Sequence, residues 1–252
     1  MIFNSMKFFS EALGMQTEAL VLLPQCGTAG QIGVNGAERS GPFKCLYLLH
    51  GLSDDQTIWM RRTSIERYAE AYGLAVVMPC GGKSFYTDMK KGMNYYTFVA
   101  KELPARICDT FNISPKRSDN FIAGLSMGGY GALKIGLREC DRFSKIAALS
   151  AVADIEEFRS GFDPDAAIFG EGAKVDPDED IFLLAEKYKD SENRPDVFLA
   201  IGQDDALLRG NRLLCAHMKD LGYNVLWKEA PGTHEWGFWD EHIKYALNWF
   251  FA

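Results

Sequence analysis

The sequence has 252 residues, of which 47% are hydrophobic and 24% charged, which is the composition of a folded globular protein with room for one large core. The formal net charge is −7, and the acidic residues are spread along the chain. This charge argues against nucleic acid or an anionic membrane as a partner, because both select basic surfaces, and it favours a small neutral ligand.

The N-terminal stretch MIFNSMKFFSEALGM lacks the continuous apolar run of a secretory signal, because Asn4, Lys7, Ser10 and Glu11 interrupt it. No other apolar run reaches the roughly 18 residues that cross a membrane. We therefore expect a cytoplasmic protein that contacts neither membranes nor nucleic acid.

The cysteines form no CxxC pair and have no histidine nearby at metal-ligand spacing. This pattern predicts reduced, mostly buried thiols and neither a metal site nor another cofactor. The six residues are Cys26, Cys45, Cys80, Cys108, Cys140 and Cys215.

The first predicted element is an antiparallel hairpin at the sheet edge, formed by residues 6–13 and 17–25. Near-continuous apolar runs of strand length follow, as parallel strands covered on both faces require, at 44–50, 74–79, 119–125, 144–150, 196–202 and 224–230. Helical patterns lie between or after them at 63–72, 95–111, 127–140, 179–188, 207–222 and 238–251. The first of these begins with Thr63 and Glu66 at the spacing of a capping box.

This alternation predicts an α/β fold with a central, mostly parallel sheet, helices on both faces and an antiparallel N-terminal edge. One domain is expected to cover residues 1–252. The stretch of about 153–195 breaks the alternation, because it is rich in Gly, Pro and Asp and too long for a plain crossover. We expect it to form a cap-like excursion at one end of the sheet. Its acidic run from Asp176 to Asp180 is typical of a helix N-terminus and lacks the periodicity of an EF-hand calcium loop.

The stretch from Gly124 to Gly128 reads Gly-Leu-Ser-Met-Gly and joins a predicted strand to a predicted helix. This is the GxSxG pattern of a nucleophile elbow, with Ser126 at its centre. The turn is so tight that a side chain two residues before or after the serine would strike the neighbouring strand or helix. The strained turn holds the serine hydroxyl out above the sheet, at the N-terminus of the helix.

A serine hydroxyl is a weak nucleophile, so it needs a base and a carboxylate that orients the base. His217 and His242 lie inside helical patterns, and His50 ends a strand, where the glycine that follows indicates a backbone role. His234 lies in the loop between the last strand and the last helix, at the end where a parallel sheet forms its sites. His234 is therefore the predicted base.

The loop after the penultimate strand carries two candidate carboxylates, Asp204 and Asp205. Either gives the chain order Ser, Asp, His that is typical of α/β-hydrolases, and spacing alone does not choose between them. Glu235 is a poorer candidate, because it adjoins His234 and neighbouring residues on an extended loop point apart.

A tetrahedral intermediate needs two N–H donors for its oxyanion. Met127, the residue after the nucleophile, supplies one, and the loop HGLSDD supplies the other through Leu52, with Gly51 as the next candidate. Three tryptophans near these loops are predicted to line an acyl or alcohol pocket, namely Trp59, Trp236 and Trp239.

At these motifs the sequence resembles the esterase D-like (S-formylglutathione hydrolase-like) branch of the α/β-hydrolases, and especially the bacterial tributyrin esterases. The similar segments extend over nearly the whole chain: LGMQT, LLHGLSDDQTIW, SFYTDM, YYTFVAKELP, GLSMGGYGALKIGL, IGQDD and PGTHEWGFWD. The resemblance implies that Ser126 is the nucleophile and His234 the base, and that Asp205, the second acid of QDD, is the partner of the base. It also implies Leu52 and Met127 as oxyanion donors.

The resemblance further implies a serine carboxylesterase that hydrolyses short-chain acyl esters through an acyl-enzyme, with an acylated carbohydrate among the candidate substrates. The alternatives are an S-formylglutathione hydrolase-type thioesterase, an acyltransferase to a carbohydrate hydroxyl, and a binding protein that keeps the fold without activity. Formylglutathione hydrolases typically carry GHSMGGHGA where this chain has GLSMGGYGA, which favours the esterase. Exposed aromatic residues would also suit a homo-oligomer.

Overall fold

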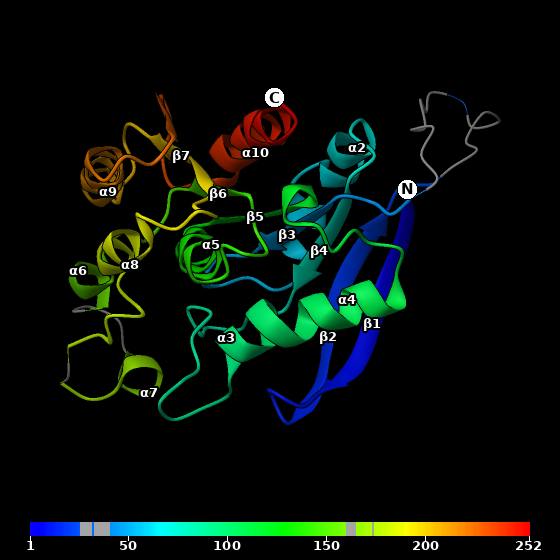
Figure 1. Ribbon diagram of the computed structural model, residues 1–252, viewed down its shortest axis with the longest axis horizontal. Coiled ribbons are helices and arrows are strands. Elements are labelled where there is room, and N and C mark those ends of the chain that lie inside the picture. The colour runs from blue at the N-terminus through cyan, green and yellow to red at the C-terminus, as the bar shows by residue number, and fades with distance from the viewer. Residues whose placement is uncertain (26–31, 33–40, 160–164, 173) are drawn as a thin grey trace.

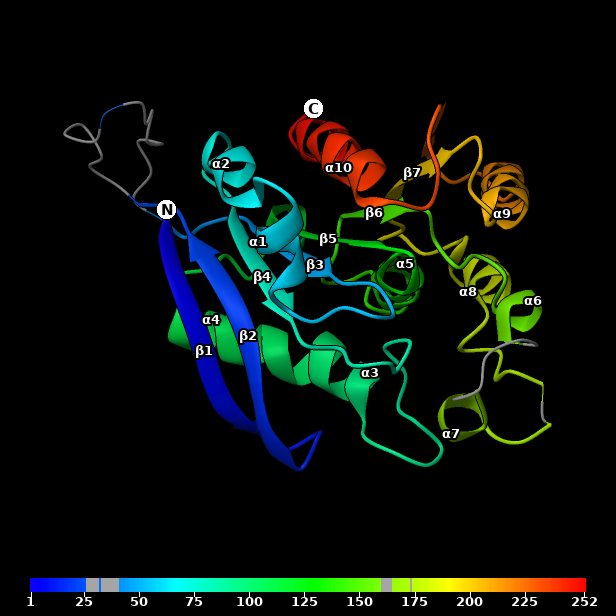
Figure 2. The same cartoon turned by 180° about the vertical axis from the view of Figure 1, so that it is seen from behind.

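An eight-stranded sheet runs through the computed structural model, which describes residues 1–25, 32, 41–159, 165–172 and 174–252 (Figures 1 and 2). The strands are β1 (Ile2–Ser10), β2 (Met15–Leu23), β3 (Cys45–Leu49), β4 (Ala75–Pro79), β5 (Asn120–Leu125), β6 (Lys145–Leu149), β7 (Asp196–Gly202) and β8 (Val225–Ala230). They lie in the order β1-β2-β4-β3-β5-β6-β7-β8. All six predicted central strands are confirmed.

The N-terminal hairpin forms the antiparallel edge, as predicted, with Ser10 opposite Met15 at its turn. Strand β1 starts at Ile2, earlier than expected. In this edge strand only alternate side chains pack against the protein, so its first residues do not form a continuous apolar run. Strand β2 continues antiparallel onto β4, and the strands from β4 to β8 are parallel. The residues of β3, β4 and β5 are all buried, as their continuous apolar runs predicted.

Helices cover both faces of the sheet, and α2 and α10 lie on the opposite side from α4 and α5 (Figures 1 and 2). One face packs against α1 (Ile58–Arg62), α2 (Ile65–Glu70) and α10 (Trp236–Phe250). The other packs against α4 (Leu103–Thr110), α5 (Met127–Arg138), α8 (Ile181–Tyr188) and α9 (Leu208–Asp220). A short helix α3 (Tyr95–Thr97) and a π-helical turn, Phe98–Glu102, lead into α4.

The predicted capping box at Thr63 is wrong. Thr63 ends the short helix α1, which was not predicted, and Ser64 occupies the N-cap of α2 without a side-chain cap. The Thr63 hydroxyl instead donates to the Trp59 carbonyl and accepts from the Ile65 N–H. Thr63 therefore lies at the junction between two helices, whereas its spacing from Glu66 predicted the start of one helix.

The excursion after β6 carries α6 (Ile155–Arg159) and α7 (Asp165–Phe169) and returns to the sheet through α8. Residues 160–164 and 173 of this stretch lie outside the described residues. Asp180 caps α8 by accepting from the N–H groups of Phe182 and Leu183, so the acidic run does begin a helix. The Tyr130 hydroxyl on α5 donates to the Glu179 carbonyl over 2.6 Å and fastens this end of the excursion to the sheet layer.

The five described cysteines are free thiols, and Cys26 lies outside the described residues. No helix in the described part of the chain is long and apolar enough to cross a membrane.

Strand β3 lies between β4 and β5, so the chain leaves β3 toward one side of the sheet and later returns on the other. The loops after β3 and β5 therefore diverge at their carboxyl ends, which is where α/β sheets form a crevice. The residues that follow β3, β5, β7 and β8 all meet at this end.

Candidate active site

Ser126 lies at the junction of β5 and α5 with a φ of +52°, which a residue with a side chain rarely adopts. A Cβ on Gly124 would lie 2.3 Å from the carbonyl oxygen of Gly128, and one on Gly128 would lie 2.5 Å from that of Leu49. Neither position tolerates a side chain, as the motif predicted. The turn thus brings the start of α5 against the end of β3 and leaves the serine hydroxyl clear of both.

The structure brings Ser126, His234 and Asp205 into one hydrogen-bonded chain. Ser126 occupies the N-cap of α5, yet its hydroxyl does not cap the helix and lies 3.0 Å from Nε2 of His234. Nδ1 of His234 lies 2.9 Å from Oδ2 of Asp205. An ionised carboxylate accepts the Nδ1 proton, so Nε2 is left free to accept the proton of the serine.

Asp205 is buried, and its other oxygen, Oδ1, accepts from the Leu207 N–H over 2.9 Å. Burial alone would raise the pKa of Asp205, but the hydrogen bonds from His234 and Leu207 outweigh it and hold the pKa below its usual value. The carboxyl group is therefore ionised at neutral pH, as an orienting partner of a histidine must be.

The two other acidic candidates are engaged elsewhere. Asp204 is exposed, and its N–H donates to the Gly232 carbonyl. The Glu235 carboxylate caps α10 by accepting from the N–H groups of Gly237 and Phe238. The geometry thus selects Asp205 from the pair that spacing left open.

The other histidines have structural partners. His50 is buried, donates from Nδ1 to the Gly51 carbonyl and accepts at Nε2 from the Gly81 N–H, and burial lowers its pKa. His242 stacks on Phe238 inside α10, and burial lowers its pKa also. His217 lies in α9, with Nε2 3.2 Å from the Phe182 carbonyl. These positions match the non-catalytic roles that the sequence indicated.

The loop after β3 approaches the serine from the side. The ring of His50 connects this loop to the loop after β4, because its Nε2 accepts from the Gly81 N–H. The backbone carbonyl of His50 accepts a hydrogen bond from the Tyr86 hydroxyl. Met127 begins α5, so its N–H has no partner within the helix. Leu52 and Gly51 lie in the same cleft as Ser126.

The cleft above Ser126 has a volume of about 500 Å³ and is partly aromatic. Of the three predicted tryptophans, Trp236 and Trp239 line it. Trp59 does not: it is 1% exposed, donates from its indole N–H to the Leu49 carbonyl and packs edge-on behind Trp236. The remaining lining residues are Gly51, Leu52, Ser53, Asp54, Leu125, Ser126, Phe158, His234 and Glu235.

The charged side chains that line the cleft are both acidic, Asp54 and Glu235. No lysine or arginine is among the described residues that line the cleft. Burial raises the pKa of Asp54, which lies in the loop after β3. The described residues that line the cleft therefore offer no cationic side chain to a bound ligand.

Two residues near the site, Phe158 and Ser150, were not predicted from the sequence. Phe158 reaches the cleft from α6, and it also lines a neighbouring hollow of about 420 Å³ between α6 and α9. Ser150 is fully buried directly after β6, close to Asp205. The sequence signal for Ser150 was its position, because it is a serine directly after a mostly apolar strand, at the end of the sheet where the site forms.

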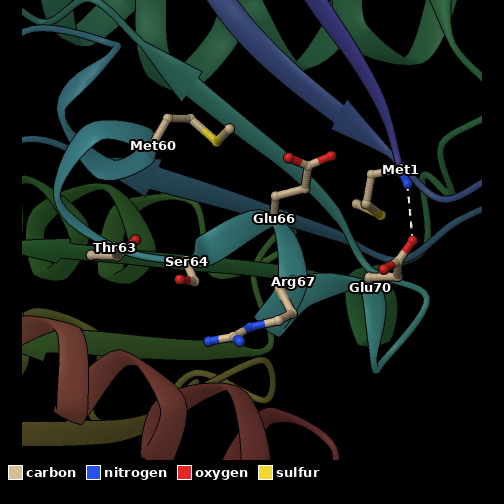
Figure 3. Close-up of a pocket in the computed structure, with 7 residues that line it drawn as sticks. All are labelled: Met1, Met60, Thr63, Ser64, Glu66, Arg67 and Glu70. Carbon is tan, nitrogen blue, oxygen red and sulfur yellow. Dashed lines mark hydrogen bonds and ion pairs between the residues drawn. The ribbon is translucent and has the colours of Figure 1, made fainter. Parts of the chain in front are cut away.

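A separate hollow of about 450 Å³ lies at α2, far along the chain from the elbow (Figure 3). Its walls carry an ion pair between the Met1 ammonium and Glu70, at 2.9 Å, and no histidine among the described residues that line it. The Thr63 and Ser64 hydroxyls therefore have no histidine base among the described residues of this hollow. No three His, Cys, Asp or Glu side chains of the described residues are grouped as a metal site would require.

Known proteins are similar to this chain over nearly its whole length. Residues 10–250 match the family model described as "Putative esterase". An acetyl esterase of Caldicellulosiruptor saccharolyticus is 33% identical, over 99% of this chain and 98% of its own. Two solved structures from Staphylococcus aureus are each 33% identical and cover 100% of this chain. Fluorophosphonate-binding serine hydrolase F superposes with a TM-score of 0.90 over 98% of its chain, and an S-formylglutathione hydrolase with 0.87 over 99%.

The match to the family model and the likeness to full-length relatives agree with the fold described above. The chain belongs to this esterase family and is a carboxylic ester hydrolase with the α/β-hydrolase fold.

Proposed function

We propose that the protein hydrolyses short-chain carboxylic esters through an acyl-enzyme formed on Ser126. The observation that carries this proposal is the unbroken chain of hydrogen bonds from Ser126 Oγ through His234 to Asp205, at 3.0 and 2.9 Å, on the floor of a small cleft.

In the first half of the reaction, Ser126 Oγ attacks the ester carbonyl and gives its proton to His234 Nε2. The tetrahedral intermediate then expels the alcohol, which takes that proton from Nε2. A water molecule next gives a proton to Nε2 and attacks the acyl group, and the proton returns to Ser126 as the acid leaves. Asp205 stays ionised throughout and stabilises the imidazolium form of His234.

The oxyanion would be held by the N–H groups of Met127 and Leu52. The first is at the N-terminus of α5, where the helix dipole also favours negative charge. A donor that is preorganised in this way contributes about 2.7 to 4 kcal/mol to transition-state stability.

The size and charge of the cleft support a small, neutral ester. Its walls combine the side chains of Trp236 and Trp239 with the acidic side chains of Asp54 and Glu235. The name of the acetyl esterase relative points in the same direction. Esters of acetyl to butyryl groups, including those on carbohydrates, are the proposed substrate class.

The similarity to an S-formylglutathione hydrolase favours a second candidate, a thioesterase. Glutathione carries two carboxylates and one ammonium group, so its thioester is anionic. The acidic lining of the cleft, with no cation among its described residues, opposes such a substrate. Transfer of the acyl group to a sugar hydroxyl instead of water is a further possibility that product analysis with mixed acceptors would reveal.

The test is a series of kcat/KM values for p-nitrophenyl esters from acetyl to decanoyl, with S-formylglutathione measured alongside and Ser126→Ala as the blank. We expect a maximum at acetyl to butyryl. A preference for S-formylglutathione by several orders of magnitude would replace the carboxylesterase with the thioesterase.

A further inference from the structure

A closed ring of four hydrogen bonds joins the loop after β3 to the loop after β4. His50 Nε2 accepts from the Gly81 N–H over 2.8 Å, and the Gly81 carbonyl accepts from the Ser84 hydroxyl over 2.6 Å. The Tyr86 N–H donates to the Ser84 hydroxyl over 3.0 Å, and the Tyr86 hydroxyl donates to the His50 carbonyl over 2.9 Å. All four residues are buried, where a hydrogen bond is stronger than it is in water.

This ring of bonds fixes which nitrogen of His50 carries the proton. A backbone N–H can only donate, so Nε2 is the acceptor of the bond from Gly81. Burial lowers the pKa of His50, which keeps the imidazole neutral at neutral pH. The single ring proton therefore lies on Nδ1, which is 2.7 Å from the Gly51 carbonyl oxygen and donates to it.

The same contacts hold the two peptide units on either side of Gly51. The first unit joins His50 to Gly51, and the Tyr86 hydroxyl holds its carbonyl. The second unit joins Gly51 to Leu52, and His50 Nδ1 holds its carbonyl. A peptide unit is planar, so the direction of the Gly51 carbonyl sets the direction of the Leu52 N–H. Glycine has the widest choice of backbone conformations, and holding both planes removes that freedom.

The backbone of the loop after β4 indicates that the Tyr86 side chain is required. Phe85 and Tyr86 have φ values of +51° and +52°, which glycine adopts without strain and which a side chain opposes. The Tyr86 ring is completely buried between Gly81 and Gly131, where a Cβ on either glycine would lie 2.4 Å from a ring atom. The tyrosine in this strained conformation is therefore explained by its fit between the glycines and by the bond from its hydroxyl to His50.

We propose that His50 and Tyr86 are positioning residues, which aim the Leu52 N–H at the oxyanion of the tetrahedral intermediate. The inference rests on the proposed function, in which Leu52 and Met127 hold that oxyanion. Met127 is held in place by α5, whereas Leu52 lies in a loop whose path depends on contacts with the loop after β4. An oxyanion donor acts on the transition state more than on the bound ester, so a loss of aim should lower kcat with little change in KM.

Two substitutions at His50 separate aim from folding. The amide of Asn can replace Nδ1 as the donor to Gly51 and leaves the Gly81 N–H without its acceptor. The amide of Gln can replace Nε2 as the acceptor from Gly81 and leaves the Gly51 carbonyl with only the Asp54 N–H, at 3.3 Å. His50→Gln should lose about 10- to 100-fold in kcat on p-nitrophenyl acetate, with KM changed less than about twofold. His50→Asn should keep kcat within about threefold of the wild type.

The stabilities of the two variants should fall in the opposite order. His50→Asn should unfold at the lower temperature, because it leaves a buried N–H without a partner, whereas the Gly51 carbonyl keeps one donor in His50→Gln. A lower kcat in the less stable variant would show that His50 acts through folding, and it would refute the positioning role.

Tyr86→Phe keeps the ring between its two glycines and removes only the hydroxyl. Its matched control is Tyr223→Phe, because Tyr223 is also buried and its hydroxyl donates to a backbone carbonyl, that of Ala185, over the same 2.9 Å, outside the cleft. Tyr86→Phe should lose about 10-fold in kcat with little change in KM, and Tyr223→Phe should stay within about twofold of the wild type. Equal kcat values in the two variants would refute the role of Tyr86.

A trifluoromethyl ketone reports on the oxyanion directly, because the serine hydroxyl adds to it and forms a stable tetrahedral oxyanion that resembles the transition state. Its Ki should rise in His50→Gln and in Tyr86→Phe by the factor by which kcat/KM falls. The Ki of the corresponding alcohol, to which the serine cannot add, should change less than about twofold in either variant. Unchanged Ki values for the ketone in both variants would overturn the inference.

The outcomes distinguish this inference from the function on which it rests. If Ser126→Ala is inactive while His50→Gln and Tyr86→Phe match Tyr223→Phe in kcat and in ketone binding, the positioning role is refuted and the proposed function stands. If Ser126→Ala keeps wild-type activity, the proposed function fails and this inference fails with it. If only one of the two positioning variants is slow, the Leu52 N–H does not depend on both peptide units and the joint role is refuted.

Discussion

Lys134 on α5 forms an ion pair with Glu179 of the excursion, and the lysine side chain is completely buried. Its ammonium also donates to the Phe85 carbonyl over 3.1 Å and to the Thr87 hydroxyl over 2.6 Å. The helix that follows Ser126 is thereby joined to the start of α8 and to the loop after β4.

Lys134→Met should destabilise the protein by about 3 kcal/mol, because it leaves the Glu179 carboxylate without its main counter-charge. Arg138 lies 3.6 Å from the same carboxylate, so part of its counter-charge remains and the loss stays near the lower end of the about 3 to 5 kcal/mol that breaking a buried ion pair costs. The double variant Lys134→Met, Glu179→Leu should recover most of the loss, since it removes both charges. Urea unfolding measures the three free energies, and a double variant less stable than Lys134→Met would contradict the explanation.

The same lysine predicts a dependence of stability on pH. Burial lowers the pKa of Lys134 from 10.5 to about 8, against the opposing effect of Glu179. Between these two values the unfolded chain binds more protons than the folded one, so the lysine adds stability as pH rises through this window. The difference in unfolding free energy between the wild type and Lys134→Met should therefore widen from pH 7.5 to pH 9.5. A constant difference would show that the lysine keeps its ordinary pKa.

Asp205→Asn should reduce kcat by about 10⁴-fold with a modest change in KM, as in the best-studied Ser-His-Asp triad. The amide is neutral, so it does not stabilise the imidazolium form of His234, and its NH2 group can donate to Nδ1 and so favour the wrong tautomer of the ring. Asp204→Asn is the matched control, one residue away and exposed, and should keep kcat within about twofold of the wild type. Steady-state kinetics on p-nitrophenyl butyrate decides between them, and a larger loss in Asp204→Asn would reverse the assignment.

Phe158→Ala should shift the acyl-length profile toward longer chains. Phe158 is shared by the 500 Å³ cleft and the 420 Å³ hollow beside it, so removal of its ring would join the two spaces. The ratio of kcat/KM for octanoyl to acetyl esters should rise about 10-fold or more, in line with the 1 to 3 kcal/mol that small differences in pocket contacts contribute. Phe182→Ala, on α8 of the same excursion and outside the cleft, should leave the ratio unchanged. Equal profiles in the two variants would show that the excursion does not limit acyl length.

Much of the fold was predictable because buried parallel strands need continuous apolar runs of strand length. The segments 44–50 and 196–202 are such runs, and each is too short for a buried helix. The elbow was predictable because only glycine fits at positions 124 and 128. The choice between Asp204 and Asp205 depends on how the loop after β7 turns. In this loop Gly202 lies close against Gly232 and the Asp204 N–H donates to the Gly232 carbonyl, and spacing alone cannot reveal these contacts.

The aromatic wall of the cleft was less predictable. Trp59 and Trp239 both follow catalytic loops in the sequence, but the indole N–H of Trp59 bonds to β3 and that of Trp239 bonds to Ser150. Which tryptophan faces the cleft depends on these buried partners, and that of Trp239 lies 89 residues away along the chain. The contribution of Phe158 likewise arises from the path of the excursion, which has no periodic pattern to reveal it.

The most direct test of the proposed mechanism is to treat the protein with a fluorophosphonate and locate the adduct by peptide mass spectrometry. We predict one phosphonyl group per chain on Ser126, with loss of p-nitrophenyl butyrate hydrolysis in proportion to labelling and no adduct in Ser126→Ala. Stoichiometric labelling of another residue, or full hydrolytic activity in Ser126→Ala, would contradict the assignment of Ser126 as the nucleophile.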